Sequence, residues 1–502
     1  MYGLSLASRS AVALLVSAAS VAAWACSTSV EGGGTGGTGG MKAGDAGSGG
    51  LAGSVALAGA SGSGNGSAGV GFGAGGSAGG NAGGAGNQAG QGGVPAMAGT
   101  SGEGGAAGSG RAGAGGGGAG GVGSPSVVFS KNVRLNDDTG SGVQHEVALA
   151  AGPRGLVISG WMDERSDRVC AFSVSTDGGV TWSKNVSIAK TSGGFVGDPS
   201  VSIDAGGTLY AVCMDYGINQ IKMMTSTDSG ATWSQARQIQ SAPDKPWIGG
   251  GTSDGTVFVS WLGTSAGIKR SLDHGLTWGG TQSLGNIIHG TTIVPSTSGL
   301  VHVPYNLDSD RNQLRYLRSK DGGQTYEPAR DLIADMGTFC FDCAPRQHPI
   351  VGAASDPSGK TVAITWSSKM PGGQGDDDVW LLYSKDGGDT WTKPIRVNDN
   401  SAASRQFQPW VAVDNYGRVH VAWTDLRDGG QNETWYARSN DPTKGFEPNL
   451  QVTDAHGTAA LDFLGDYKGI VVQDSDVLVV WEDTRRGNGD IYFARAPGAA
   501  GP

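Results

Sequence analysis

Acids, arginines and imidazoles recur in short segments of this chain that each precede a β-rich run. The segments read QHE at Gln144, GDP at Gly197, DKPW at Asp244, IHG at Ile288, RQHP at Arg346, RQFQPW at Arg405 and LGDY at Leu464. An arginine fork suits a planar carboxylate, and neighbouring carboxyl and imidazole groups can divide the roles of general acid and general base. If these segments meet in space, they can bind one polar ligand and act on it.

The loops after the second strands, MDER at Met162, TDLR at Thr424 and EDTRR at Glu482, add further acids and arginines to the same face. From both groups we predict a catalytic set, which consists of His145, Asp163, Asp198, Asp244, Arg346, His348, Arg405 and Asp466. The predicted substrate-binding residues are Lys245, His289, Arg165, Asp425, Arg427, Asp483 and Arg485. The alternative is structural: the same polar groups bond to the backbone of neighbouring repeats and surround a channel without acting on a ligand.

An internal repeat of eight residues, which we call the box, positions these segments. It reads STDGGVTW at Ser175, STDSGATW at Ser226, SLDHGLTW at Ser271, SKDGGQTY at Ser319 and SKDGGDTW at Ser384, with a degraded copy, SNDPTKGF, at Ser439. The aspartate and the hydroxyls can bond to the amides of a tight turn, the glycines allow positive φ, and the aromatic residue packs under the hairpin. We therefore assign a structural role to Asp177, Asp228, Asp273, Asp321 and Asp386.

A second repeated feature lies upstream of each box, where a β-rich run ends in Trp161, Trp261, Tyr305, Trp366, Trp423 or Trp481, with Cys213 in the second unit. Short alternating strands with hardly any helical periodicity predict an all-β fold, a β-propeller of four-stranded antiparallel blades. The count indicates seven blades, with six as the alternative.

The N-terminal strand is predicted to close the ring. The seventh unit stops at Ile491–Ala496, before an outermost strand, whereas the sequence at Phe129–Asp137 matches the outer strands at Trp391–Asp399 and Phe446–Asp454. Supplying the missing strand from the other end of the chain leaves no exposed sheet edge.

Strand parity predicts where a site would lie. Directions alternate in an antiparallel blade, so the segment that leads into the first strand and the loop after the second strand share one face. The turns of the repeated box lie on the other face. The leading segments crowd round the central channel and can converge on one ligand.

The box is identified as the Asp-box, and residues 126 to 496 resemble the sialidase superfamily. The resemblance implies an exo-acting glycoside hydrolase of sialidase type that acts on glycans. True sialidases carry an Arg-Ile-Pro motif and six blades; this chain lacks the motif, so their arginine triad and tyrosine nucleophile cannot be placed here. The alternative function is a non-catalytic glycan-binding or protein-interaction scaffold on the cell surface.

The front of the chain predicts export. Residues 1–25 have one early charge, Arg9, and an apolar run too short for a lasting membrane span, which is typical of a signal peptide. The segment Ala23–Cys26 resembles a lipobox, so we expect a lipoprotein lipidated at Cys26 and anchored in the outer membrane or at the cell surface. An ordinary secretory signal is the alternative.

Residues 26–124 are predicted to be a disordered Gly/Ala/Ser-rich tether, and residues 125–502 the propeller. The tether has almost no large apolar residues to bury. As a flexible coil of about 90 residues it would have a root-mean-square span of about 50 Å.

The net charge of −10 argues against a nucleic-acid partner, and we expect a monomer that binds a glycan or glycoconjugate. No phosphate-binding loop is evident, so no cofactor and no metal are assigned. Cys340 and Cys343 are predicted to form a structural disulfide, with a redox pair or half of a metal site as alternatives. The acidic triplet Asp376–Asp378 is either a solvated loop or a calcium site.

Overall fold

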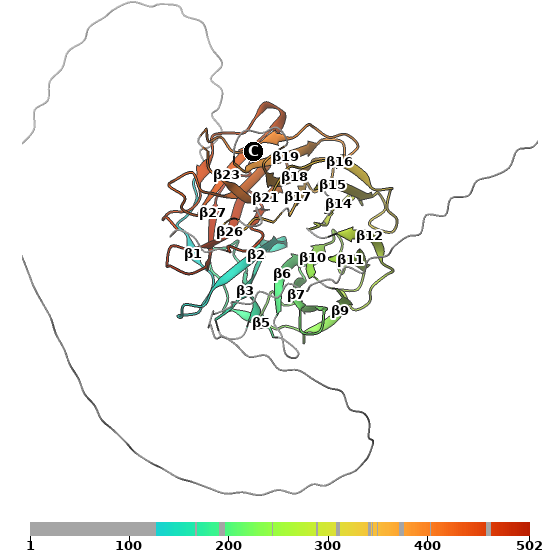
Figure 1. The fold of residues 1–502 in the computed structure, drawn as a ribbon. Helices are drawn as coiled ribbons and strands as arrows, with labels where there is room; N and C mark the ends of the chain where they lie inside the picture. Colours follow the sequence, from blue (N-terminus) through green and yellow to red (C-terminus); the bar gives the residue numbers. More distant parts are fainter. Residues whose placement is uncertain are drawn as a thin grey trace, which may run out of the picture. The chain divides into compact units, whose positions relative to one another are not determined.

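The computed structural model describes residues 127–501, apart from residues 166–167, 190–195, 243, 288–289, 308–311, 340–342, 344, 349, 371–375, 402 and 458–462. The described residues form seven antiparallel sheets that surround a common centre (Figure 1). The predicted all-β propeller is therefore confirmed with seven blades, and the six-blade alternative is excluded.

Each blade is a meander whose first strand lies innermost. Blade 1 contains β2 (Gln144–Ala151), β3 (Val157–Asp163), β4 (Val169–Ser175) and β5 (Val186–Ile188). Blade 2 contains β6 (Val196–Ile203), β7 (Leu209–Asp215), β8 (Gln220–Ser226) and β9 (Arg237–Ser241). Blade 4 contains β13 (Val294–Pro295), β14 (Val301–Leu307), β15 (Gln313–Ser319) and β16 (Arg330–Ile333).

Blades 5 and 6 repeat the pattern. Blade 5 contains β17 (Gly352–Ser355), β18 (Val362–Ser368), β19 (Asp378–Ser384) and β20 (Ile395–Arg396). Blade 6 contains β21 (Gln406–Val413), β22 (Val419–Asp425), β23 (Glu433–Ser439) and β24 (Leu450–Gln451). Two single-turn 3₁₀ helices, Pro153–Gly155 and Pro442–Lys444, lie in turns.

Blade 3 reaches the same layout with fewer elements: β10 (Asp244–Gly250), β11 (Val257–Ser271) and β12 (Gln282–Ile287). The first part of β11 pairs with β10 and the later part pairs with β12. The single element β11 thus occupies the second and third strand positions of the blade.

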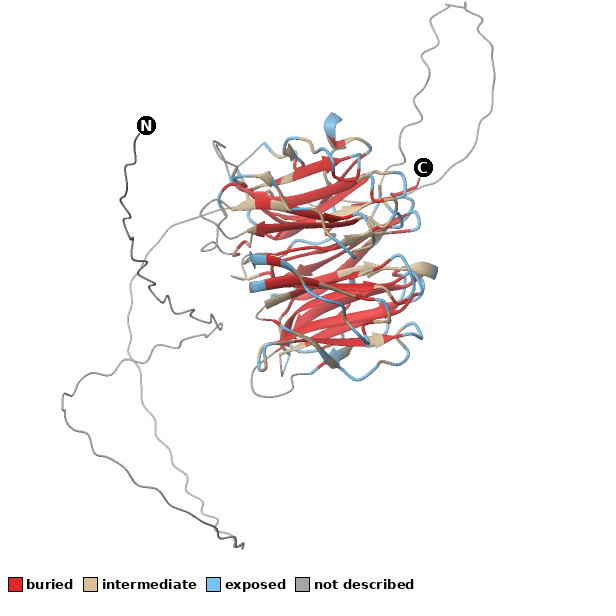
Figure 2. Cartoon of the chain, turned by 90° about the vertical axis from the view of Figure 1, so that its right-hand side faces the viewer, coloured by how far each residue is buried: buried red, intermediate tan, exposed pale blue. Residues whose placement is uncertain are grey.

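The core lies between the faces of neighbouring blades, where the strands are buried and the turns exposed (Figure 2). Trp161, Trp261, Trp366, Trp423 and Trp481, each near the end of the second strand in one of five blades, are at most 2% exposed. Blade 2 has Cys213 in this place, and a disulfide joins it to Cys170 of blade 1. A covalent bond thus replaces one of the large apolar contacts between blades.

Each Asp-box is a self-contained turn. In the first box, both carboxylate oxygens of Asp177 accept bonds from Thr181, through its backbone N–H at 2.8 Å and its hydroxyl at 2.6 Å. The hydroxyl of Ser175 accepts the N–H of Gly179 at 2.8 Å. Gly179 has φ 88°, and a Cβ there would collide with the Phe493 ring of blade 7, so glycine serves both the turn and the blade contact.

The first and the last strand lie in the same blade. Blade 7 contains β25 (Gly469–Gln473), β26 (Asp476–Asp483) and β27 (Asp490–Ala496), and its fourth strand is β1 (Val133–Arg134). Val133 lies opposite Phe493 in the register. The predicted closure by the N-terminal strand is confirmed, and Figure 1 shows β1 beside β27.

The C-terminal tail takes the place of a seventh box. Arg318, just ahead of the fourth box, donates to the carbonyl of Gly387 in the next blade's box at 2.6 Å. Arg438, at the corresponding position of blade 6, donates to the carbonyl of Ala499 at 2.9 Å instead. Ala500 is buried and its N–H donates to Ser475 at 2.8 Å. Among the described residues, no helix has the length and apolar character needed to cross a membrane.

Deleting residues 128–136 should leave β27 with an unpaired edge. We expect a lower melting temperature and concentration-dependent self-association, because an exposed edge strand pairs with other chains. Thermal unfolding and light scattering of the full chain with and without the deletion check this. A monomer with unchanged melting temperature would show that β1 does not close the ring.

The Asp-boxes should make the folding stability depend on pH in the acidic range. Donors from the turn, first the Thr232 side chain, lower the pKa of Asp228 from 3.8 to about 2, and Thr277 does the same for Asp273. Because these carboxyls are more acidic folded than unfolded, their stabilisation is present above pH 3.8 and is lost as pH falls toward 2. We expect Asp228→Asn to flatten the pH dependence of the unfolding midpoint in this window, relative to Lys184→Met.

Candidate functional site

The two faces of the propeller are chemically distinct. The Asp-box turns bond to the turns between first and second strands, as in Gly178 N–H to Gly155 O at 2.9 Å and His274 N–H to Gly255 O at 2.9 Å. At the opposite end, the start of β2 pairs with the end of β3, with Gln144 opposite Asp163. We call these the Asp-box face and the leading-loop face, and the parity expected from the repeats is present.

Four first strands begin with the same irregularity on the leading-loop face. Glu146, Asp198, Lys245 and Gln408 have φ of 57°, 48°, 40° and 51°, and each lies where the register between the first and second strands shifts. A left-handed conformation at a non-glycine residue costs about 1 to 3 kcal/mol and concentrates at functional sites, where a bulge redirects a side chain.

Three of these redirected side chains meet at one ammonium group. Lys245 Nζ lies 2.9 Å from Asp198 Oδ1, 2.7 Å from Asp466 Oδ2 and 3.9 Å from Glu146 Oε1. Arg346 Nη2 contacts the same Asp466 oxygen at 3.1 Å. Five blades therefore contribute to the group that we call the Lys245 cluster, which comprises Glu146, Asp198, Asp244, Lys245, Arg346 and Asp466.

Burial and charge set the protonation of the cluster. Burial raises the pKa of Glu146 well above 4.5, the Asp198 charge adds to this, and Lys245 opposes it. Burial also acts to raise the pKa of Asp466, but Lys245, His348 and Arg346 together hold that pKa below its ordinary value. One acid thus stays ionised beside the two cations while another favours its neutral form.

Tyr216 joins two acids of the cluster. Its hydroxyl contacts Asp198 Oδ2 and, at 2.5 Å, Asp244 Oδ1. A phenol has one hydrogen, so contact with two carboxyl groups requires a second proton on one of them. Burial and the nearby Asp198 raise the pKa of Asp244 to about 6, which makes Asp244 the carboxyl that carries the proton in mild acid.

Two predicted imidazoles flank the cluster. His348 is partly buried, and its charge is among those that lower the pKa of Asp466. The ring of His145 packs on Phe463 at 4.9 Å, and the guanidinium of Arg346 lies over the same ring at 4.1 Å. His145 also contacts Glu164 at 3.3 Å, so it sits one ring away from the acids.

Aromatic rings pack next to the charges. Trp247 lies 5.0 Å from Trp410 and 5.6 Å from Tyr467, centroid to centroid. Lys245 Nζ stands 5.9 Å from the Tyr467 ring. This apolar packing limits the water around the cluster and strengthens its electrostatic interactions.

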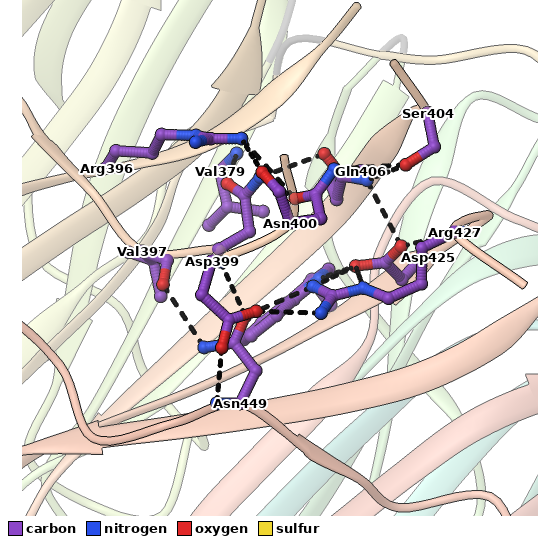
Figure 3. Close-up of polar contacts among 12 residues, drawn as sticks. Val379, Arg396, Val397, Asp399, Asn400, Ser404, Gln406, Asp425, Arg427 and Asn449 are labelled. Atoms are coloured by element: carbon purple, nitrogen blue, oxygen red, sulfur yellow. Dashed lines mark hydrogen bonds and ion pairs between the residues drawn. The ribbon is translucent and has the colours of Figure 1, made fainter. Parts of the chain in front are cut away.

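The three arginines that we predicted to bind substrate contact acids of their own and of neighbouring blades. Arg427 contacts Asp425 of its own blade and Asp399, which follows the outer strand of blade 5, at 2.8 Å each, and Asn449 completes the set (Figure 3). Arg165 repeats this arrangement with Asp163 and Asp137, and Arg485 repeats it with Asp483 and Asp454.

These contacts match the structural alternative for Asp163, Arg165, Asp425, Arg427, Asp483 and Arg485. Asp163, Asp425 and Asp483 are at most 1% exposed, which leaves them no surface to offer a substrate. Arg405 contacts Asp377 at 3.2 Å and donates to the carbonyl of Pro345 at 3.1 Å. Pro345 is the residue before Arg346 in the sequence. His289 lies outside the described residues.

The remaining predicted sites are structural where they can be seen. Cys343 is in a disulfide, and its predicted partner Cys340 lies outside the described residues, as does Cys26. In the acidic triplet, Asp377 pairs with Arg405, and Asp378 pairs with Arg396 at 2.8 Å. Arginines thus already balance two of the three acids considered as calcium ligands.

On the Asp-box face, Asp204, Asp254 and His274 lie close enough to suggest a metal site. However, His274 turns Nδ1 toward Asp204 at 3.4 Å and Nε2 toward Asp254 at 3.7 Å. The two nitrogens are on different edges of the ring, so the imidazole links the acids and does not join them round one ion.

Sequence reasoning missed Glu146 and Tyr216. The segment QHE drew attention to His145, whereas the bulge places the next residue in register with Asp198 and Lys245. Tyr216 follows the end of a second strand, as Glu164 follows Asp163 in blade 1. Aligning the repeats residue by residue across the bulge would have found Glu146. Scanning the residues that follow each second strand would have found Tyr216.

Comparison with known proteins agrees with the repeat. Residues 173–184 match the BNR/Asp-box repeat. The chain is an Asp-box β-propeller. No curated protein matches this propeller.

Solved structures with a similar fold include two different enzymes and a protein of unknown function. The NanB sialidase from Streptococcus pneumoniae is 12% identical, with a TM-score of 0.43 over 59% of this chain and 67% of that one. A Dyadobacter fermentans protein of unknown function is 14% identical, with a TM-score of 0.43 over 74% and 99%. An α-L-arabinanase from Penicillium chrysogenum is 12% identical, with a TM-score of 0.39 over 74% and 99%. The propeller spans about two thirds of the sialidase chains that it matches, and these likenesses concern the fold alone.

Replacing Lys245 by Met should strongly destabilise the propeller. Asp198 and Asp466 would remain buried without their shared cation, and removing one partner of a buried ion pair costs about 3 to 5 kcal/mol. Urea unfolding measures the change, with Lys184→Met, at an exposed lysine, as the control. Equal stability of the two variants would show that Lys245 does not bind these acids.

Proposed function

We propose that this propeller is a glycoside hydrolase that removes terminal sugars from glycans at its leading-loop face. The observation that carries the proposal is the contact of the Tyr216 hydroxyl with both Asp198 and Asp244. Glycoside hydrolysis needs one group that gives a proton to the leaving oxygen and a second that attacks or activates water. Asp198 and Asp244, which share the hydroxyl of Tyr216, can supply both groups.

Asp244 is the proposed general acid. Burial and the charge of Asp198 raise the pKa of Asp244 to about 6, which suits proton donation near that pH. The bond from the backbone N–H of Lys245 to Asp244 Oδ1, at 2.9 Å, fixes the carboxyl relative to the bulge. The acid therefore keeps its position while the proton leaves.

Asp198 and Tyr216 form the proposed opposing group. Asp198 accepts from both Tyr216 and Lys245, and it can take the phenol proton as the oxygen of Tyr216 attacks the sugar, or can activate a water at the same place. Burial raises the pKa of Tyr216 well above 10, with the two aspartates adding to the rise, so the phenol needs this base.

Arg346 is the proposed recognition group. Its side chain is 35% exposed, whereas its partner Asp466 is fully buried. Asp466 and the Phe463 ring hold the guanidinium, while part of the Arg346 side chain stays exposed. The guanidinium can bind a substrate carboxylate or a pair of hydroxyls.

A second function is favoured by the packing of the cluster. Lys245 is only 12% exposed and satisfies acids from three other blades, as expected of a structural hub. In that case the leading-loop face is a glycan-binding or protein-interaction surface without turnover, and the proposed lipid anchor at Cys26 would hold it at the cell surface.

Release of free sugar from a mixed pool of sialylated and neutral glycans distinguishes the two functions. We expect the full chain to release a sugar, and Asp244→Asn to lower kcat/KM by about a hundredfold or more, as for loss of a general acid. Activity should fall as pH rises above about 6, because the acid form of Asp244 is then lost.

Lys184→Met is the matched control and should keep full activity. Arg346→Ala should raise KM more than it lowers kcat, since Arg346 is assigned to binding. Absence of release from every glycan in the pool, with glycan binding retained, would replace the hydrolase by the binding function.

A further inference from the structure

A cavity of about 690 Å³ lies on the Asp-box side of the molecule, between the boxes of blades 3 and 4. It shares no residue with the Lys245 cluster. The side chains that matter for the argument are Lys269, Arg270, Leu272, Trp278, Gln282, Gln324 and Tyr326.

Two glycines line the cavity at positions where other blades carry side chains. After the box aromatic, blade 1 has Ser183–Lys184 and blade 5 has Thr392–Lys393, whereas blade 3 has Gly279–Gly280. A Cβ at Gly280 would meet nothing within 4 Å, and one at Gly279 would only touch a carbonyl at 3.4 Å. Neither glycine is needed for a left-handed turn, so the pair's structural effect is the space it leaves.

The walls combine rings with polar ends of side chains. Trp278 and Tyr326 are the half-buried box aromatics of blades 3 and 4, and Gln282 and Gln324 stand beside them. Leu272 is 62% exposed at a box position where blades 1 and 2 have threonine and blades 4 and 5 have lysine. Aromatic and apolar surface with a few amides is a typical lining for a small-molecule or sugar site.

The charge of the cavity is positive in a chain of net charge −10. Lys269 and Arg270 both line the cavity, and Asp273 is the one acid among its lining residues. Arg270 uses Nη1 on the carbonyl of Gly322 at 2.6 Å, which fixes its guanidinium at the wall. The carboxylate of Asp273 is occupied by its own turn, with both oxygens bonded to Thr277.

We propose that this cavity binds an acidic saccharide chain, one that carries carboxylate or sulfate groups. The rings of Trp278 and Tyr326 cover the apolar faces of sugar units, the glutamine amides bond to hydroxyls, and Lys269 with Arg270 faces the anionic groups. The site is separate from the proposed hydrolytic centre and does not depend on it. It would hold a long glycan on one face while the opposite face meets its terminus or another chain.

Calorimetric titration of the full chain with three short oligosaccharides tests the assignment. An oligogalacturonate presents carboxylates, a chondroitin sulfate oligosaccharide presents sulfates, and a maltooligosaccharide is neutral. We expect at least one acidic probe to bind about tenfold more tightly than the neutral one, a difference of about 1.4 kcal/mol. The more tightly bound acidic probe identifies the anionic group. Equal or absent binding of all three overturns the proposal.

Gly280→Lys is the decisive variant, because it restores the residue found at the same place in blades 1 and 5 without a steric conflict. It should weaken acidic saccharide binding about tenfold by filling the cavity, although it adds a positive charge. Lys269→Glu should weaken binding at least as much. Lys184→Gly, the reverse change in blade 1, should leave the affinity unchanged.

A peptide ligand and the Asp244→Asn variant provide two further tests of the site. An oligoglutamate peptide that binds as tightly as the acidic saccharide, and is lost in Gly280→Lys, would make the site a peptide site. Asp244→Asn should bind the saccharide normally, so failure of the proposed hydrolase and failure of this site are told apart. Binding that survives Gly280→Lys would place the saccharide elsewhere.

Discussion

The pairing of β1 with β27 is the constraint on which the rest of the propeller depends. Val133 and Phe493 lie at opposite ends of the described chain and meet in one sheet. Without this contact, blade 7 lacks its outer strand, and the packing of blade 7 on blade 1 has to close the ring without a shared strand. The Lys245 cluster joins Glu146 of blade 1 to Asp466 of blade 7 through an ammonium from blade 3, so it requires a closed ring.

Closure also explains where the charges can be buried. A lysine side chain is costly to remove from water unless its partners are in place beforehand. Here Glu146 and Asp198 come from bulged first strands, where their left-handed positions lie between residues that pair with the second strands, and Asp466 precedes the first strand of blade 7. The sheets therefore bear the strain of the bulges, and the centre of the ring receives a set of acids with different protonation states.

The repeats made the blade count, the closure and the two faces predictable, because an Asp-box folds by contacts within eight residues and recurs in register. The bulge was not predictable from the same pattern. The bulge shifts by one position the residue whose side chain reaches the Lys245 cluster. The sequence therefore indicated His145, whereas Glu146 is the residue that reaches it. Arg165, Arg427 and Arg485 each follow an aspartate by two residues, so their first partners can be found in the sequence. Their second partners, such as Asp137, belong to the preceding blade and cannot be found in this way.

The contact of Tyr216 with two carboxyl groups also could not be predicted from the sequence. Neither the residue type nor its position after β7 reveals that two carboxyl groups share its hydroxyl. The cavity between the third and fourth boxes is a similar case: Gly279 and Gly280 read as ordinary turn residues until the space beside Trp278 is seen. Both features arise from side chains that come together only after the blades pack.

The tail at Ala499 and Ala500 bears on how such a protein can change its number of repeats. Both ends of the chain are used in blade 7, one as its outer strand and the other as the substitute for its box. An extra repeat appended after Ala496 would find no unpaired strand to join and would take the tail away from Arg438. A change in blade number that keeps this closure therefore adds or removes a repeat within the ring.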